Sequence, residues 1–305
     1  MKISVVSTLY YSAPHIHEFY TRVCAVIASL SIESYEIIFV NDGSPDNSLE
    51  LAVAIAKENT HVTVVDLSRN FGHHKAMMTG LSYATGEMVY LIDSDLEEEP
   101  EWLVEFNTLL QTHQADVVYG IQHIRRGELK EQLSGALFYK VMDVISRSDY
   151  PRDVVTARLM TKRYVNALLQ HHEREIFIVN LWHITGFKQV TCNVKKHSTS
   201  PSTYTMQKKI SHVLNAVTSY ETPLVWIFYT GCIISITAFI CIIYLIFNWL
   251  IVKDTLTGWT SLIVSIWLVG GLIITVLGFI GIYLSLIYLE VKQRPLTIIR
   301  DVFRY

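Results

Sequence analysis

The chain has 305 residues, a formal net charge of −3 at pH 7, and 50% hydrophobic residues. Its mean hydropathy of +0.30 is too high for a purely soluble protein of this size. The slightly acidic balance gives no reason to expect a nucleic-acid partner.

The N-terminal part of the chain alternates predicted strands with predicted helices. Strands are indicated by short apolar runs bounded by polar turns, at 2–9, 35–40, 62–67 and 88–92. Helices are indicated between them, where apolar residues recur at helical spacing, at 16–30, 49–58 and 75–84. This alternation predicts an α/β domain with a mostly parallel, Rossmann-like sheet. The dinucleotide fingerprint Gly-x-Gly-x-x-Gly is missing, so hydride transfer has no support.

Acidic residues follow two of the predicted strands. Asp42 comes after the second strand, and Asp93 and Asp95 come after the fourth. Ligands of open α/β sheets bind at the carboxyl ends of the strands, and two aspartates one residue apart can face one Mg²⁺ or Mn²⁺ ion. Taken alone, the pair also fits solvated loop residues, and Asp42 fits a helix cap or an Asx-turn.

Two long apolar runs lie near the end of the chain, at 224–252 and 261–289. Each exceeds the roughly 20 residues needed to cross a bilayer, so we predict two transmembrane helices. The stretch before them carries apolar residues on one helical face, which predicts an interfacial helix; packing against the globular domain is the alternative. The predicted domains are a globular α/β domain at 1–200, a juxtamembrane amphipathic helix at 201–222, a transmembrane hairpin at 223–290 and a cytoplasmic tail at 291–305.

Positive charge flanks the apolar runs. Lys208 and Lys209 precede the first run, and Lys292 and Arg294 follow the second, whereas the connecting hairpin carries one lysine, Lys253. The positive-inside rule therefore places both termini in the cytoplasm and the protein in the inner (cytoplasmic) membrane. The apolar start of the chain is too short for a signal peptide, so the first domain is expected to remain cytoplasmic. The four cysteines form no Cys-x-x-Cys motif and are expected to be reduced.

Several short motifs occur in a characteristic order. They are Val-Asn-Asp-Gly-Ser at 40–44, Arg-Asn-Phe-Gly at 69–72, Asp-Ser-Asp-Leu at 93–96, Arg-Leu-Met at 158–160 and Glu-x-Lys-x-Arg-Pro at 290–295. The ordered set resembles glycosyltransferase family 2, and within it the membrane-anchored polyprenyl-phosphate glycosyltransferases, such as dolichyl-phosphate mannose synthases and bacterial undecaprenyl-phosphate glucosyltransferases. The resemblance implies a GT-A fold and an inverting transfer of one sugar, at the cytoplasmic face, from a UDP- or GDP-linked nucleotide sugar to a polyprenyl phosphate. It is also compatible with a homo-oligomer.

The same resemblance assigns roles to individual residues. The residues implied to hold Mg²⁺ or Mn²⁺ are Asp93, Asp95 and Glu97. The residues implied to bind the nucleotide sugar are Tyr10, Asp42, Arg69 and Asp93. The residues implied to bind the acceptor phosphate are Arg125, Lys130 and Ser134. The residues implied to be catalytic are Asp95, Arg126 and Arg158.

The chain departs from the family pattern at three places. Ser12 stands where relatives have Glu in Pro-x-Tyr-Asn-Glu, Thr156 stands where they have an acid before Arg-Leu-Met, and 197–200 replaces an Arg-x-x-Gly. Two alternatives therefore stay open. One is a transferase of the same fold that adds a sugar to a hydroxyl of a lipid-diphosphate-linked saccharide in surface-polysaccharide assembly, and the other is an inactive membrane scaffold. Three histidine pairs lack a third ligand at metal spacing and are predicted to be surface or helix-start residues: His15/His17, His73/His74 and His171/His172.

Overall fold

A computed structural model describes residues 2–30, 32, 34–122, 153–174, 176–196 and 258–305, together with short stretches between 223 and 247. The α/β part and the long C-terminal helix belong to separate compact units, and each is described by itself.

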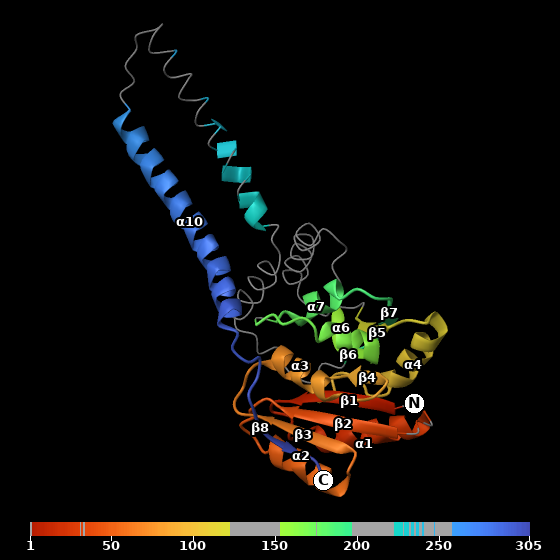
Figure 1. Ribbon diagram of the computed structural model, residues 1–305. Coiled ribbons are helices and arrows are strands. Elements are labelled where there is room, and N and C mark those ends of the chain that lie inside the picture. The colour runs from red at the N-terminus through yellow and green to blue at the C-terminus, as the bar shows by residue number, and fades with distance from the viewer. Residues whose placement is uncertain are drawn as a thin grey trace. The chain divides into compact units, whose positions relative to one another are not determined.

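An eight-stranded sheet with the order β7-β5-β6-β4-β1-β2-β3-β8 forms the centre of the α/β part (Figure 1). The neighbours of β1 and β2 are parallel to them, whereas β6 runs antiparallel to β4 and to β5. The strand bounds are β1 Lys2–Leu9, β2 Ser34–Asn41, β3 Val62–Leu67, β4 Met88–Leu91, β5 Val117–Ile121, β6 Val154–Thr161, β7 Gln189–Asn193 and β8 Ile299–Phe303.

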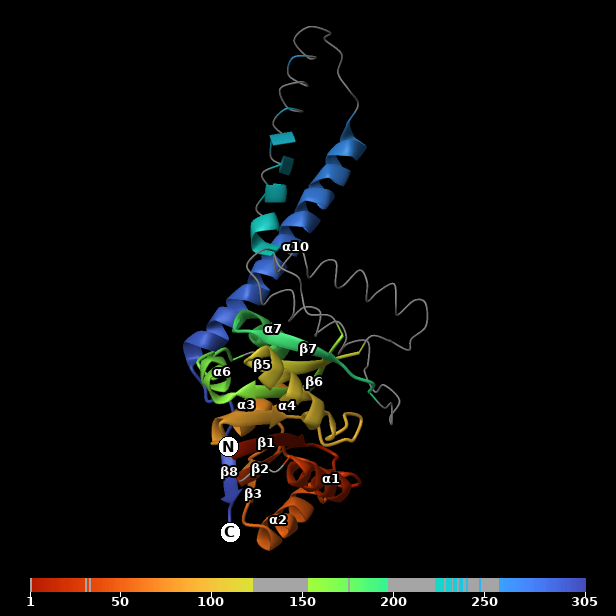
Figure 2. The same cartoon turned by 90° about the vertical axis from the view of Figure 1, so that its right-hand side faces the viewer.

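Helices cover both faces of this sheet (Figure 2). Successive residues of a strand point to opposite faces, so Val5 belongs to the hydrophobic cluster that includes α1, α2 and α4, and Val6 belongs to the cluster that includes α3, α6 and α7. The helix bounds are α1 Ile16–Ser29, α2 Ser48–Glu58, α3 His73–Tyr83, α4 Trp102–His113, α6 Lys162–Leu168 and α7 Ile178–Ile184. The four predicted strands and three predicted helices match β1–β4 and α1–α3 within two residues, and the predicted α/β fold class is confirmed.

The edge strand β8 comes from the segment predicted as a tail. It pairs antiparallel with β3, and Ser68 N–H donates to Ile298 O at 2.8 Å. Arg300 Nη1 lies 3.5 Å from the buried carboxylate of Asp66. The sheet therefore takes one edge from chain that follows the C-terminal helix, which the sequence analysis did not foresee.

That helix, α10, spans Trp259–Lys292. Within the described residues, Val269–Lys292 forms a helix long and apolar enough to cross a membrane, with a mean hydropathy of 2.4. It coincides with most of the second predicted span. The predicted interfacial helix at 201–222, and most of the first predicted span at 224–252, lie outside the described residues.

Glu36 of β2 joins that strand to β1 and to the turn before β4. Its buried carboxylate accepts hydrogen bonds from Ser4 Oγ at 2.5 Å, Thr85 N–H at 2.6 Å and Lys2 Nζ at 2.9 Å. Burial alone would raise the pKa of Glu36, but these hydrogen bonds lower it from the usual 4.5 to about 2.

This pKa makes a prediction about acid stability. The stabilisation by Glu36 is complete above its unfolded pKa and is lost as the pH falls from about 4.5 to about 2, by about 3 kcal/mol in total. Chemical unfolding at a series of pH values should show this loss. In Glu36→Gln the free energy of unfolding should fall less steeply as the pH drops from about 4.5 to about 2. A variant with the same pH dependence as the wild type would contradict the assignment.

Candidate active site

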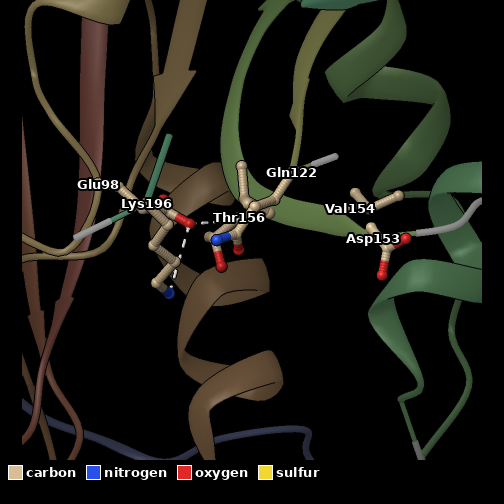
Figure 3. A pocket seen from close by; sticks show the side chains of 7 residues that line it. Glu98, Gln122, Asp153, Val154, Thr156 and Lys196 are labelled. Atoms are coloured by element: carbon tan, nitrogen blue, oxygen red, sulfur yellow. Dashed lines mark hydrogen bonds and ion pairs between the residues drawn. The ribbon is translucent and has the colours of Figure 1, made fainter. Parts of the chain in front are cut away.

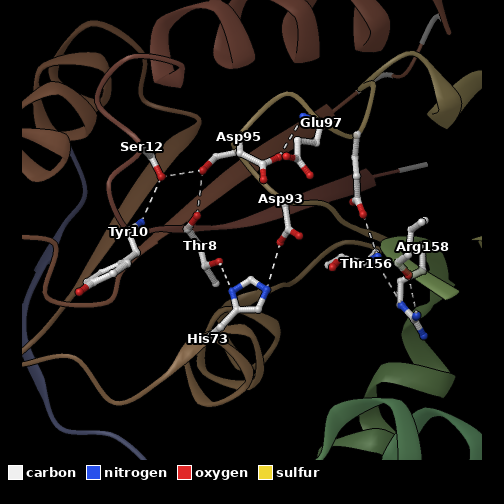
Figure 4. A network of polar contacts seen from close by, with 12 residues as sticks. Thr8, Tyr10, Ser12, His73, Asp93, Asp95, Glu97, Thr156 and Arg158 are labelled. Atoms are coloured by element: carbon white, nitrogen blue, oxygen red, sulfur yellow. Dashed lines mark hydrogen bonds and ion pairs between the residues drawn. The ribbon is translucent and has the colours of Figure 1, made fainter. Parts of the chain in front are cut away.

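The Asp93–Asp95 loop follows β4 at the carboxyl end of the sheet, where the sequence predicts it (Figure 4). Ile92 N–H still donates to Val6 O at 3.1 Å, so the chain stays against β1 for one residue past the strand. Ser94 Oγ then donates to Thr8 O at 3.0 Å and contacts Ser12 Oγ at 2.9 Å. These bonds fix the backbone between the two aspartates.

His73 joins this loop to β1. It is the first residue of α3, as predicted, and its ring Nε2 lies 3.3 Å from Asp93 Oδ1 while Nδ1 lies 3.0 Å from Thr8 Oγ1. Burial would lower the pKa of His73, but the charge of Asp93 raises it overall. Burial likewise would raise the pKa of Asp93, but His73 lowers it. The pair therefore favours imidazolium beside carboxylate, a contact that the sequence analysis missed.

Asp95 differs from Asp93 in its surroundings. Its Oδ1 accepts the Glu97 N–H at 3.0 Å. Burial and repulsion by Asp93 raise the pKa of Asp95. Two carboxylates that repel each other in this way are stabilised by a cation between them.

Glu97 and Glu98 diverge although they are adjacent. Glu97 Oε2 lies 3.1 Å from Lys196 Nζ. Glu98 is fully buried, accepts the Thr156 N–H at 2.9 Å and lies 3.9 Å from Lys196 Nζ. Burial, together with repulsion by Asp93, raises the pKa of Glu98 to about 8. Neither Glu98 nor Lys196 was predicted as a site residue. The run of glutamates after Asp-Ser-Asp indicates acidic groups near the site, but it does not show which glutamate points into it.

The donor set fits a hard divalent cation. In the described part of the chain, no three His, Cys, Asp or Glu side chains form a ready metal cluster. Mg²⁺ does not need one, because it is usually held by one or two carboxylates plus substrate phosphates. The Asp93 and Asp95 carboxylates meet that requirement, whereas Glu97 is engaged by Lys196.

Asp42 supports the loop that leads to α3. Its buried carboxylate accepts the Phe71 N–H at 2.7 Å and the Gly72 N–H at 3.0 Å. Burial raises the pKa of Asp42 overall, although both hydrogen bonds oppose the shift. Gly43 has φ of 60°, and a Cβ there would lie 2.5 Å from Asn70 N, so the two loops need glycine to approach. Asp42 thus positions the loop that carries His73.

Tyr10 directly follows β1, and Arg69 comes two residues after β3. Tyr10 is 50% exposed, its ring meets that of Tyr11 edge-on at 4.9 Å, and its N–H donates to Ser12 Oγ at 3.1 Å. Arg69 lies over the ring of Phe71, 4.1 Å from its centroid. Both predicted nucleotide-binding side chains are therefore near the carboxyl ends of the strands.

Arg158 lies on β6, directly opposite Leu91 of β4, which is two residues before Asp93. Its fully buried guanidinium donates to Thr156 O at 3.1 Å and to Val155 O at 3.3 Å, and lies over the ring of Trp182. Burial lowers the pKa of Arg158 to about 9. Its described partners are carbonyl oxygens and aromatic rings, with no carboxylate in salt-bridge contact. The other predicted acceptor residues lie outside the described residues: Arg125, Arg126, Lys130 and Ser134.

Carboxylates gathered at the carboxyl ends of parallel strands are the arrangement of an α/β enzyme that binds its ligand at that edge. Residues 4–169 match the family model described as glycosyl transferase family 2. The chain belongs to this family, as the sequence motifs predict, and is a glycosyltransferase.

Relatives match over almost the whole chain. A Mycobacterium tuberculosis protein with a provisional glycosyltransferase name is 44% identical over 99% of this chain and 89% of its own length. The Escherichia coli prophage bactoprenol glucosyl transferase homolog is 31% identical over 99% of each chain. Among solved structures, Mycobacterium tuberculosis glucosyl-3-phosphoglycerate synthase, in complex with Mn²⁺, UDP and phosphoglyceric acid, is 17% identical over 71% of this chain and 76% of its own, with a TM-score of 0.49.

Proposed function

We propose that the protein is a membrane-anchored, metal-dependent, inverting glycosyltransferase that moves one sugar from a UDP- or GDP-linked nucleotide sugar to a polyprenyl phosphate. The observation that carries this proposal is the pair of mutually repelling carboxylates, Asp93 and Asp95, fixed at the carboxyl end of β4. End-to-end similarity to a relative named bactoprenol glucosyl transferase supports the polyprenyl acceptor.

Asp93 and Asp95 would hold Mg²⁺ or Mn²⁺ against the donor diphosphate. The cation would neutralise the charge that develops on the leaving diphosphate. His73 keeps the Asp93 carboxylate in one orientation, because it is itself held by Thr8. Ser94 holds the backbone between the two ligands.

The nucleotide would lie over the carboxyl ends of β1 and β2. The exposed Tyr10 ring offers a stacking surface for the base, and Arg69 offers a cation near the phosphates. Asp42 contributes through the loop that it positions, since both of its oxygens accept backbone N–H groups.

The acceptor is proposed to be a phosphate. A sugar hydroxyl must lose a proton during attack and needs a general base, whereas a phosphate monoester is largely dianionic at neutral pH because its second pKa is about 6. Arg158 supplies a cation on β6, beside β4, the strand that precedes Asp93. It is buried and has no ion-pairing carboxylate among the described residues. The family resemblance adds Arg126 as a catalytic residue, and Arg125, Lys130 and Ser134 as phosphate ligands.

The reaction is proposed to occur at the cytoplasmic face of the membrane. Helix α10 supports an anchor, and the lysines and arginines that flank the apolar runs support cytoplasmic termini. The same proposal includes an α/β domain at 1–200, an interfacial helix at 201–222, two spans at 223–290 and a cytoplasmic tail at 291–305.

Product chemistry tests the proposal. Membranes containing the protein are incubated with labelled UDP-glucose or GDP-mannose, Mg²⁺ and undecaprenyl phosphate. The expected product is a lipid from which mild acid releases the free sugar and leaves lipid phosphate. Label found instead in a saccharide on a lipid diphosphate, with undecaprenyl phosphate inert, would favour the hydroxyl acceptor; no transfer from any donor would favour the scaffold.

A further inference from the structure

A polar pocket of about 210 Å³ opens beside Glu98, three residues after Asp95 in the chain (Figure 3). This volume is many times the roughly 15 Å³ that one water molecule requires, so the pocket has room for a small ring. It lies between the chain after β5, the start of β6 and the Glu97–Glu98 turn. Its lining residues are Glu98, Gln122, Asp153, Val154, Val155, Thr156 and Lys196.

Glu98 is the unusual member of this lining. Its side chain is completely buried, and Oε1 accepts the Thr156 N–H at 2.9 Å. Its second oxygen, Oε2, is buried and has no hydrogen-bond partner among the described residues. Leaving a buried polar atom unpaired is costly in the folded protein, so such an atom in a pocket wall points to a ligand that completes it.

The pocket lies next to the proposed diphosphate site at Asp93 and Asp95. Thr156, which lines it, also lies close enough to Asp93 to help lower the pKa of that carboxyl. Lys196 lies at its rim, 3.1 Å from Glu97 and 3.9 Å from Glu98, and balances part of the acidic charge. A group attached to a diphosphate at Asp93 and Asp95 would therefore reach this space.

The lining matches a neutral, hydroxyl-rich ring. Carboxyl, amide and hydroxyl groups can each bond hydroxyls, which both donate and accept. Among the described lining residues there is no aromatic ring on which a base would stack, and the one cation among them, Lys196, is already paired with Glu97. A phosphate or a sugar carboxylate would instead meet Glu98 and Asp153.

We propose that this pocket is the subsite for the transferred sugar, that the sugar is an uncharged hexose, and that Glu98 is a specificity-determining residue that bonds a ring hydroxyl through Oε2. The inference rests on the proposed nucleotide-sugar donor. It assigns to Glu98 a role in sugar recognition separate from that of Asp93 and Asp95.

Glu98→Gln tests this role with little change in shape. The amide oxygen can still accept the Thr156 N–H, while the pocket-facing oxygen becomes an NH₂ group. Calorimetric titration of the full-length protein in detergent with Mg²⁺, at about pH 9 so that the Glu98 carboxyl is ionised and Oε2 is an acceptor, compares UDP with UDP-glucose, and GDP with GDP-mannose. For the donor that the wild type prefers, the variant should bind the nucleotide sugar about tenfold more weakly and the free nucleotide equally well, as expected for one lost hydrogen bond. Glu99→Gln, at a neighbour that does not line the pocket, should change neither.

Other outcomes distinguish failure of the proposed sugar subsite from failure of the proposed nucleotide-sugar donor. Equal weakening of nucleotide and nucleotide sugar by Glu98→Gln, or no weakening, would overturn the sugar subsite, as would wild-type binding of UDP-glucuronate as tight as that of UDP-glucose. If the wild type bound neither nucleotide, the proposed donor itself would fail. Should Glu98→Gln unfold at a lower temperature than the wild type, Gln122→Ala, on the facing wall, must give the same selective loss.

Discussion

Asp95→Asn is expected to lower the rate of sugar transfer about a hundredfold or more, equivalent to about 3 kcal/mol of transition-state stabilisation. The substitution removes one of two charged oxygen donors from the proposed cation site and leaves the side-chain volume unchanged. Turnover of labelled donor by membranes that contain equal amounts of wild type and variant measures the effect. Addition of a chelator to the wild type should produce a comparable loss.

The fold should tolerate this change. Burial and repulsion by Asp93 raise the pKa of Asp95, which means that the charged form is costly in the folded protein. The neutral amide removes that cost, so the thermal unfolding midpoint should stay the same or rise. Asp301→Asn, on the exposed strand β8, serves as the matched control and should leave turnover unchanged. Full activity of Asp95→Asn, or of the chelated wild type, would refute the metal assignment.

Arg158→Met should have a similarly large effect on transfer, again about a hundredfold, because it deletes a cation from the proposed acceptor side. The flexible apolar side chain of Met fills much of the buried space beside Trp182. Burial lowers the pKa of Arg158, so the charged guanidinium is costly in the folded state. Loss of turnover should therefore come without a comparable loss of stability, which thermal unfolding measures alongside activity.

Two further variants make this result interpretable. Arg158→Lys keeps the charge but lacks the planar group that lies over Trp182, so it should recover only part of the activity. Arg163→Met removes a more exposed arginine, paired with Asp116, and should affect stability more than turnover. An Arg158→Met protein that retained wild-type turnover would remove Arg158 from the site.

The first four strands could be predicted because each is a continuous apolar run that ends at a polar turn. The Asp93–Asp95 site followed from the same signal, since a buried strand ended at two carboxylates. The later strands lack that signal. In β6 the fully buried Arg158 interrupts the apolar pattern, and β8 carries Arg300 and Asp301 because it lies at an exposed edge.

The missed site residues have a different explanation. His73 and Lys196 reach Asp93 and Glu97 only because α3 and the chain after β7 return to the same edge of the sheet. No local pattern encodes such a meeting. The choice between Glu97 and Glu98 depends on which way each side chain turns after Asp95, and the loop in which they lie has no periodicity from which that could be inferred.

The position of β8 has a consequence for biosynthesis. Strand β3 is synthesised early, but its partner emerges from the ribosome only after α10. Until then β3 presents unpaired N–H and C=O groups along one edge, which is a site for mispairing with other chains. Cutting the chain before α10 to obtain the α/β part alone would make that transient state permanent. Grafting residues 294–305 back through a flexible linker in place of the intervening chain should restore the missing edge.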